Sequence, residues 1–179
     1  PSVFGCQAPD SGNAEILAHF GTEKQKKKYL QPLLNGKIAS CYSMTEPQAG
    51  ADPGEFTCTA EQEKGQWVIN GEKWFASHAR FAEFLIVMVV TDKSVPIHEG
   101  ASMLLVENDT PGMEIIRNSA VGPYAEQGDG VHAYIKFKNC HVPLDNMLGE
   151  PGQGFLVAQT RLGGGRVHHA MRTVGVLNK

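Results

Sequence analysis

The sequence predicts a mainly β protein, in which an antiparallel barrel or sandwich lies between an N-terminal helical segment and a C-terminal helix. Several short segments between residues 37 and 150 alternate in polarity or are rich in valine and isoleucine, and turn signals such as Asp109-Thr110-Pro111-Gly112 separate them. Before and after this region, apolar side chains recur at helical spacing instead. We therefore divide the chain into residues 1–36, 37–150 and 151–179.

The N-terminal segment contains two predicted helices. Ala14 to Phe20 carries apolar side chains on one face, and Gly21 interrupts this pattern. Thr22 to Gln25 then has the spacing of a capping box, which begins a second helix. Gly36 stands where a helix end favours a left-handed residue, so we expect the second helix to stop there.

The middle region predicts strands at residues 38–44, 55–62, 66–69, 72–76, 84–91, 102–107, 113–117 and 131–138. Asn70-Gly71 is the strongest hairpin signal, because both residues tolerate the positive φ angles of a tight turn. Phe84 to Thr91 is a continuous apolar run, which fits a strand buried on both faces.

A break at Gly149 to Gly154 precedes the last element. Phe155 to Asn178 has helical spacing, but Gly163-Gly164-Gly165 interrupts it. Each glycine costs about 1 kcal/mol relative to alanine inside a helix. Three together predict a close approach to a ligand or a neighbouring helix, or a kink.

Composition excludes several classes of function. The net charge of −3 gives no electrostatic footprint for nucleic acid, and the basic cluster from Lys24 to Lys28 fits a solvated helix face. The longest apolar run, Phe84 to Val90, is too short to span a membrane. The 4 cysteines form no CxxC pair and His168-His169 lacks the HExxH arrangement, so we predict reduced intracellular thiols and no metal site.

Two segments are candidates for a binding site. The stretch CYSMTEPQAGADPGEF, from Cys41 to Phe56, turns from a strand into a loop rich in Pro and Gly, and Trp74-Phe75-Ala76-Ser77 is aromatic. The residues alone leave two interpretations open. The segments are a wide turn and ordinary core packing, or they offer backbone donors, the Thr45 hydroxyl and an aromatic wall to a flat cofactor with a polar edge.

The stretch YSMTEPQAGAD resembles a signature of the acyl-CoA dehydrogenases, which are flavoenzymes. The segments GQWVINGEKWFAS, ENDTPGMEI, VHAYIKFKNCHVPLDNMLGEPGQGF and RLGGGR match the family in the same order. The chain is most similar to the subgroup that contains family members ten and eleven. The resemblance implies the end of an N-terminal helical domain, a complete middle β-domain for flavin and acyl-CoA, and the start of a C-terminal helical domain.

The resemblance also implies FAD as the cofactor, with binding residues Tyr42, Met44, Thr45, Gly50, Ala51, Trp74, Phe75 and Ala76. Ala51 is further implied to approach the pantetheine of the substrate, and Arg166 to lie near the acyl-CoA. Three departures from the family pattern are Ala51, Ala76 and Gly163, where the family usually has a serine, a hydroxyl residue that bonds flavin N5, and an acidic residue.

The activity that the resemblance implies is α,β-dehydrogenation of fatty acyl-CoA in fatty acid β-oxidation, with electrons passing to an electron-transferring flavoprotein. The general base is a glutamate late in the C-terminal domain or directly before the helix arginine, where this chain has Gly165. No catalytic residue is therefore visible, and we expect the fragment alone to be inactive.

Two alternatives remain, a non-catalytic paralogue that binds acyl-CoA and an acyl-CoA oxidase. For the dehydrogenase itself we expect a mitochondrial or peroxisomal protein that forms a homo-oligomer at full length.

Overall fold

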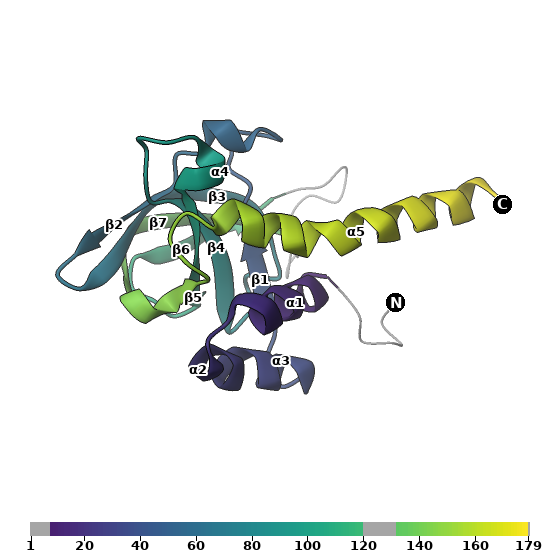
Figure 1. Cartoon of the computed structure of the whole chain (residues 1–179), viewed down its shortest axis with the longest axis horizontal. Helices are drawn as coiled ribbons and strands as arrows, with labels where there is room; N and C mark the ends of the chain where they lie inside the picture. The colour runs from purple at the N-terminus through teal and green to yellow at the C-terminus, as the bar shows by residue number, and fades with distance from the viewer. Residues whose placement is uncertain (1–7, 120–131, 179) are drawn as a thin grey trace.

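A computed structural model of the chain describes residues 8–119 and 132–178. Figure 1 shows a β-sheet with short helices packed beside it and one long helix that extends well beyond it. The helices are α1 (Asp10–Phe20), α2 (Glu23–Gln25), a π-helical turn (Lys26–Leu30), α3 (Gln31–Leu34), α4 (Ile97–Gly100) and α5 (Gly154–Leu177). The strands are β1 (Ser40–Ser43), β2 (Thr59–Glu63), β3 (Gln66–Ser77), β4 (Phe84–Val90), β5 (Ala101–Glu107), β6 (Met113–Asn118), β7 (His132–Pro143) and β8 (Met147–Leu148). Turns of 3-10 helix lie at Pro53–Glu55 and Leu144–Asn146.

The two N-terminal helical signals are confirmed. The Thr22 side chain accepts from the Gln25 N–H at 3.2 Å, and the Gln25 side chain accepts from the Thr22 N–H at 2.9 Å, which is a complete capping box. Gly36 has a φ of 64° just after the last helical turn. The Gly36 N–H donates to the carbonyl of Leu33 at 3.0 Å, so the helix ends where the left-handed residue was expected.

The strands form one mixed sheet in the order β6-β7-β3-β1-β4-β5-β8, with β2 paired to both β3 and β4. The expected mainly β region is present, but the expectation of antiparallel pairing is only partly confirmed, because the sheet is mixed. β1 runs parallel to β4, as does β2 at one pair of residues, and the other pairings are antiparallel. The reason is that β3 runs opposite to β1 and β2, and the chain reverses again before β4, so that β1, β2 and β4 share a direction.

The predicted hairpin at Asn70-Gly71 is wrong. β3 is one strand of 12 residues, and Asn70-Gly71 forms a bulge in its pairing with β7. The turn between β2 and β3 lies instead at Lys64 and Gly65, whose φ angles are 48° and 79°. Gly71 is required for a different reason: its φ is 140°, and a Cβ there would lie 2.5 Å from the Cα of Cys58.

Two hydrophobic clusters pack on the two faces of β4, which is buried along its whole length as expected. Leu85, Val87 and Val89 pack with residues of β2, β3, β5 and β7. Phe84, Ile86 and Met88 pack on the other face with side chains of α1, α3, α5 and the π-helical turn. These helices therefore cover one face of the central strands.

The long helix α5 is continuous at its three glycines, and the expected close approach to a ligand or a neighbouring helix stays a prediction. It runs through Gly163-Gly164-Gly165 without a break, and apart from the adjoining backbone of the helix itself no described atom lies within 4 Å of a Cβ placed at any of the three. Its first turns pack on the sheet, whereas its second half extends away from it (Figure 1). Among the helices of residues 8–119 and 132–178, none has the length and apolar character to cross a membrane.

Candidate functional site

The candidate site begins at the end of β1. This strand lies between β3 and β4, and Tyr42 is paired with Ser77 of β3 and with Ile86 of β4. The chain leaves the sheet at Met44 and returns at β2, so residues 44–58 form a loop over the edge of the central strands. Tyr42, Met44 and Thr45 are each partly exposed.

Opposite this loop, β3 contains a second bulge. The register with β7 shifts between Lys73 and Ala76, and Phe75 takes a φ of 52°. The rings of Trp74 and Phe75 stack with their centroids 4.9 Å apart and an interplanar angle of 10°, and Phe75 is 41% exposed. Bulges re-aim side chains next to functional sites. This bulge presents a flat aromatic surface near the C-terminal end of β3.

One hydrogen bond joins the two segments. The Trp74 N–H donates to the Thr45 carbonyl at 2.8 Å. The structure therefore brings together five of the residues that the sequence predicted, namely Tyr42, Met44, Thr45, Trp74 and Phe75.

The other three predicted positions, namely the Gly50-Ala51 turn, Ala76 and Arg166, are not part of this aromatic surface. Gly50, with a φ of 56°, and Ala51 are exposed in the loop. Ala76 is fully buried in the core, so its missing hydroxyl is not a gap in the aromatic surface. Arg166 lies on the exposed part of α5, where its guanidinium donates to Gln159 at 2.7 Å.

Sequence reasoning missed Ser77, which supplies a hydroxyl one residue beyond Ala76. Ser77 faces Tyr42 across the β1–β3 pair, and its hydroxyl shares a hydrogen bond of 2.8 Å with the His132 ring. The signal was present in the sequence as a hydroxyl residue two positions after Phe75.

A buried ion pair supports the loop, and it was also missed. Lys73 and Glu46 have fully buried side chains, and their charged atoms are 2.8 Å apart. Burial opposes the charged form of Glu46. The Lys73 charge and hydrogen bonds from Lys73, Thr57 and Gln48 outweigh this, so the pKa of the carboxyl lies below its ordinary value.

Tyr42 is held from its other side by Arg161 of α5, which the sequence analysis did not single out. The guanidinium carbon lies 3.8 Å from the centre of the Tyr42 ring, and Arg161 Nε donates to Asn13 of α1 at 2.8 Å. Burial raises the pKa of Tyr42 and lowers that of Arg161. This contact links α1, β1 and the base of α5.

The surface fits a flat ring with a polar edge, such as the isoalloxazine that the resemblance implies. Trp74 and Phe75 supply an aromatic wall. Trp74 Nε1 and Ser43 Oγ are buried and have no hydrogen-bond partner within the described parts of the chain. Trp67 Nε1 and Ser119 Oγ are unpaired in the same way outside this surface, so the fit to a flat ring rests on the aromatic wall.

An apolar groove adjoins the loop on the side of α5. It has a volume of about 680 Å³ and is lined by Asp52, Pro53, Gly54, Ile97, His98, Phe155, Leu156 and Gln159. Its lining begins at Asp52, the residue that follows Ala51 in the chain.

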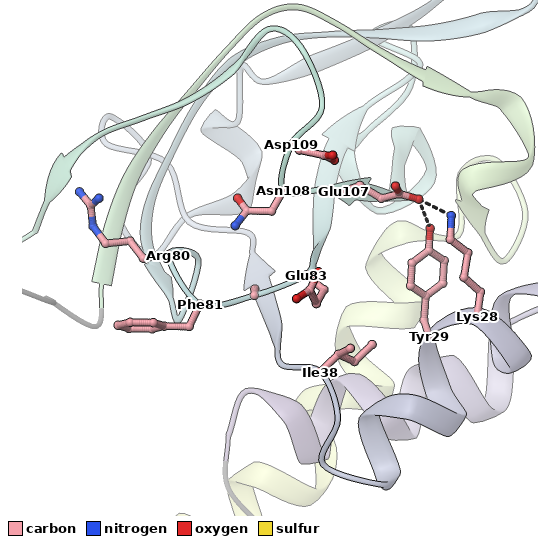
Figure 2. Close-up of a pocket in the computed structure, with 10 residues that line it drawn as sticks. Lys28, Tyr29, Ile38, Arg80, Phe81, Glu83, Glu107, Asn108 and Asp109 are labelled. Carbon is pink, nitrogen blue, oxygen red and sulfur yellow. Dashed lines mark hydrogen bonds and ion pairs between the residues drawn. The ribbon is translucent and has the colours of Figure 1, made fainter.

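A second cavity, of about 470 Å³, lies between the π-helical turn and the ends of β4 and β5. Figure 2 shows Lys28 and Tyr29 converging on Glu107 at its side, and the Tyr29 hydroxyl donates to Glu107 at 3.0 Å. The hydrogen bond from Lys28 holds the pKa of Glu107 below its ordinary value. This cavity shares no residue with the loop or the aromatic surface.

The cysteines offer no reactive site in the described residues. Cys41, Cys58 and Cys140 are buried free thiols, and Cys6 lies outside the described residues. Burial raises the pKa of Cys58 to about 12 and that of Cys140 to about 11, which keeps them protonated and inert. No cluster of three or more possible metal ligands occurs within residues 8–119 and 132–178.

Comparison with known proteins points to one family. The family model described as "Acyl-CoA dehydrogenase, middle domain" matches residues 41–140. The chain is 45% identical to acyl-CoA dehydrogenase family member 11 of Pongo abelii, covering 100% of this chain and 23% of that protein. It is 44% identical to the probable acyl-CoA dehydrogenase FadE2 of Mycobacterium tuberculosis, covering 100% of this chain and 44% of the relative.

Solved structures agree. A putative acyl-CoA dehydrogenase from Mycobacterium abscessus superposes with a TM-score of 0.88 at 42% identity, over 98% of this chain and 44% of that one. Butyryl-CoA dehydrogenase from Megasphaera elsdenii gives a TM-score of 0.78 at 33% identity, over 86% of this chain and 39% of that one. The chain thus spans less than half the length of each of these proteins.

Proposed function

The chain belongs to the acyl-CoA dehydrogenase family, and from that premise we propose that it is the middle segment with which a longer dehydrogenase binds FAD and fatty acyl-CoA. The observation that carries the proposal is the hydrogen bond from Trp74 to Thr45, which sets a loop of potential donors beside an aromatic wall. Such a site orients a cofactor and leaves the difficult chemistry to it.

Each part of the surface has a role in this proposal. The Thr45 N–H and hydroxyl donate to the polar edge of the flavin, and fixed donors there stabilise negative charge in a reduced ring. Trp74 and Phe75 cover the ring and exclude water from one side. Ser77 of β3 adds a hydroxyl residue paired with Tyr42 of the neighbouring strand β1. When bound, FAD supplies the acceptor for the hydride that leaves the β-carbon of the substrate.

The acyl-CoA substrate is proposed to bind along the loop. The exposed Gly50-Ala51 turn lets the backbone approach phosphates or amides closely. The neighbouring groove, with its apolar lining and a few polar groups, suits a narrow arm such as pantetheine. Arg166 is exposed on α5 and donates to Gln159, and we propose that it meets the acyl-CoA in the complete protein.

The proton-accepting base is proposed to lie in the rest of the longer protein. α,β-Dehydrogenation needs a carboxylate or an equivalent base at the α-carbon. The helical position before Arg166 is Gly165, which has no side chain to serve. We expect no turnover from this chain alone, and electrons from the complete enzyme to pass to an electron-transferring flavoprotein.

The test uses the full-length protein. We expect it to be purified with bound FAD whose absorbance bleaches when fatty acyl-CoA is added without oxygen. Thr45→Val and Phe75→Ala should each reduce FAD content, whereas the matched control Thr173→Val, on the exposed half of α5, should not.

Absence of FAD from the full-length protein would favour the non-catalytic paralogue that binds acyl-CoA. That alternative is motivated by Ala51 and Gly163, which lack the side chains usual in the family. Release of peroxide in air with acyl-CoA would instead identify an oxidase.

A further inference from the structure

The Lys73–Glu46 pair lies behind the proposed flavin surface and has no direct role in the proposed function. Both side chains are fully buried. Two buried charges are costly to desolvate, and a pair like this often adds little net stability compared with apolar residues of the same size. Stability alone therefore does not explain the pair, and we consider its effect on the loop that it contacts.

Every polar atom of the pair is used. Lys73 Nζ donates to Glu46 Oε1 and to the Met44 carbonyl, both at 2.8 Å, and it lies 4.6 Å from the centre of the Phe56 ring. Glu46 also accepts from the Thr57 N–H at 2.7 Å and from the Cys58 N–H at 3.1 Å. The pair thus ties the two ends of the loop to each other and to β3.

The bond to Met44 has an electronic consequence. The Met44 carbonyl and the Thr45 N–H belong to one peptide unit. A hydrogen bond from a charged donor to the carbonyl polarises that unit, and a polarised peptide has a stronger N–H donor. The low dielectric of a fully buried site increases the effect.

We propose that Lys73, held by Glu46, is a positioning residue that fixes and polarises the Met44–Thr45 peptide, and so strengthens the Thr45 N–H as a donor to the reduced flavin. The inference rests on the proposed function, because it assigns a ligand to that N–H. The carboxylate of Glu46 moderates the effect, since its negative charge offsets part of the Lys73 charge.

The experiment measures the reduction equilibrium of FAD in the full-length protein against a reference dye at pH 7. Lys73→Met removes the donor to Met44, so reduction should become less favourable. We expect about a ten-fold fall in the equilibrium constant, which is about 30 mV for a two-electron couple. Glu46→Gln removes the opposing negative charge but keeps Lys73, so the constant should rise.

The two opposite directions separate this role from a merely structural one, because loosening of the loop would shift both variants the same way. Lys73→Arg keeps a charged donor and should restore most of the wild-type value. The control Lys24→Met removes an ion pair of the same kind with Asp145 at the surface, where the lysine side chain is 78% exposed, and should change nothing.

Each outcome decides a question. FAD that binds with an unchanged equilibrium in Lys73→Met, or shifts in the same direction in both variants, overturns the inference and leaves the proposed function standing. If only Glu46→Gln folds, a rise in its constant supports the inference, and a fall or no change overturns it. If only Lys73→Met folds, recovery of the wild-type constant by Lys73→Arg supports the inference, and no recovery overturns it. Wild-type protein without FAD overturns the proposed function, and this inference with it.

Discussion

The guanidinium of Arg161 lies 3.8 Å from the centre of the Tyr42 ring, and this contact fixes the base of α5 against β1. Arg161 also donates to Asn13 of α1, whose own amide donates to Ser40 of β1 at 2.9 Å. α1, β1 and α5, which are far apart in the chain, are therefore joined at Ser40 and Tyr42, in the strand that leads into the candidate loop. Tyr42 is held in one orientation as a result.

We expect Arg161→Met to lower the free energy of unfolding by about 2–3 kcal/mol, because it removes a cation–π contact and leaves buried acceptors unpaired. Urea denaturation of the chain measures this. Arg166→Met is the matched control, since Arg166 is exposed on the same helix, and it should stay within about 0.5 kcal/mol of wild type. Equal losses in the two variants would contradict the role given to Arg161.

Two glycines should respond to alanine in opposite ways. Gly71→Ala forces a Cβ to within 2.5 Å of the Cys58 backbone at a φ of 140°, so the chain should lose several kcal/mol or fail to fold. Gly164→Ala meets nothing within 4 Å and should stabilise the helix by up to about 1 kcal/mol. Thermal unfolding of both variants checks the pair, and a destabilised Gly164→Ala would show that α5 needs a glycine there.

The sequence predicts local features well because their causes are local. The Thr22–Gln25 capping box and the turn at Gly36 depend on residues within one or two helical turns, and both are confirmed. Asn70-Gly71 shows the limit. The positive φ that suits a tight turn equally suits a bulge, and the choice is made by the pairing of β3 with β7, which lies more than 60 residues away in the chain, as for Gly71 and Phe137.

The candidate site also has a part that the sequence predicts and a part that it does not. The motif YSMTEPQAGAD, through its resemblance to a family, predicted the loop, and the resemblance of GQWVINGEKWFAS predicted the aromatic pair. The supporting charges were not found, because lysine and glutamate in a sequence are normally assigned to the surface. Only the fold shows that Lys73 and Glu46, which are 27 residues apart, are buried together.

Removal of one member of that pair should be costly. Lys73→Met leaves the Glu46 carboxylate buried without its partner, and we expect a loss of about 3–5 kcal/mol. The double variant Lys73→Met/Glu46→Gln buries no charge and should recover most of the loss. A double-mutant cycle from urea denaturation gives the coupling between the two, and a double variant as unstable as the single one would contradict the ion pair as the cause.

Acid should destabilise the fold through Glu46. Its pKa in the folded chain lies below the ordinary value of 4.5, because Lys73 and hydrogen bonds overcome the opposing effect of burial. A group with a depressed folded pKa contributes stability that is fully present above its unfolded pKa and is lost as pH falls through the folded one.

The free energy of unfolding should therefore be flat with respect to Glu46 above about pH 5 and should fall below about pH 4.5, by up to about 1.4 kcal/mol per pH unit for one proton. Glu107 and Asp145 also have lowered pKa values but are exposed enough for solvent to weaken their share. Urea denaturation from pH 3 to pH 7 measures the slope, with the double variant Lys73→Met/Glu46→Gln as the control in which Glu46 cannot titrate. Because that variant keeps every other carboxyl, an acid slope as steep as that of the wild type would assign the pH dependence to those surface groups instead of to the buried pair.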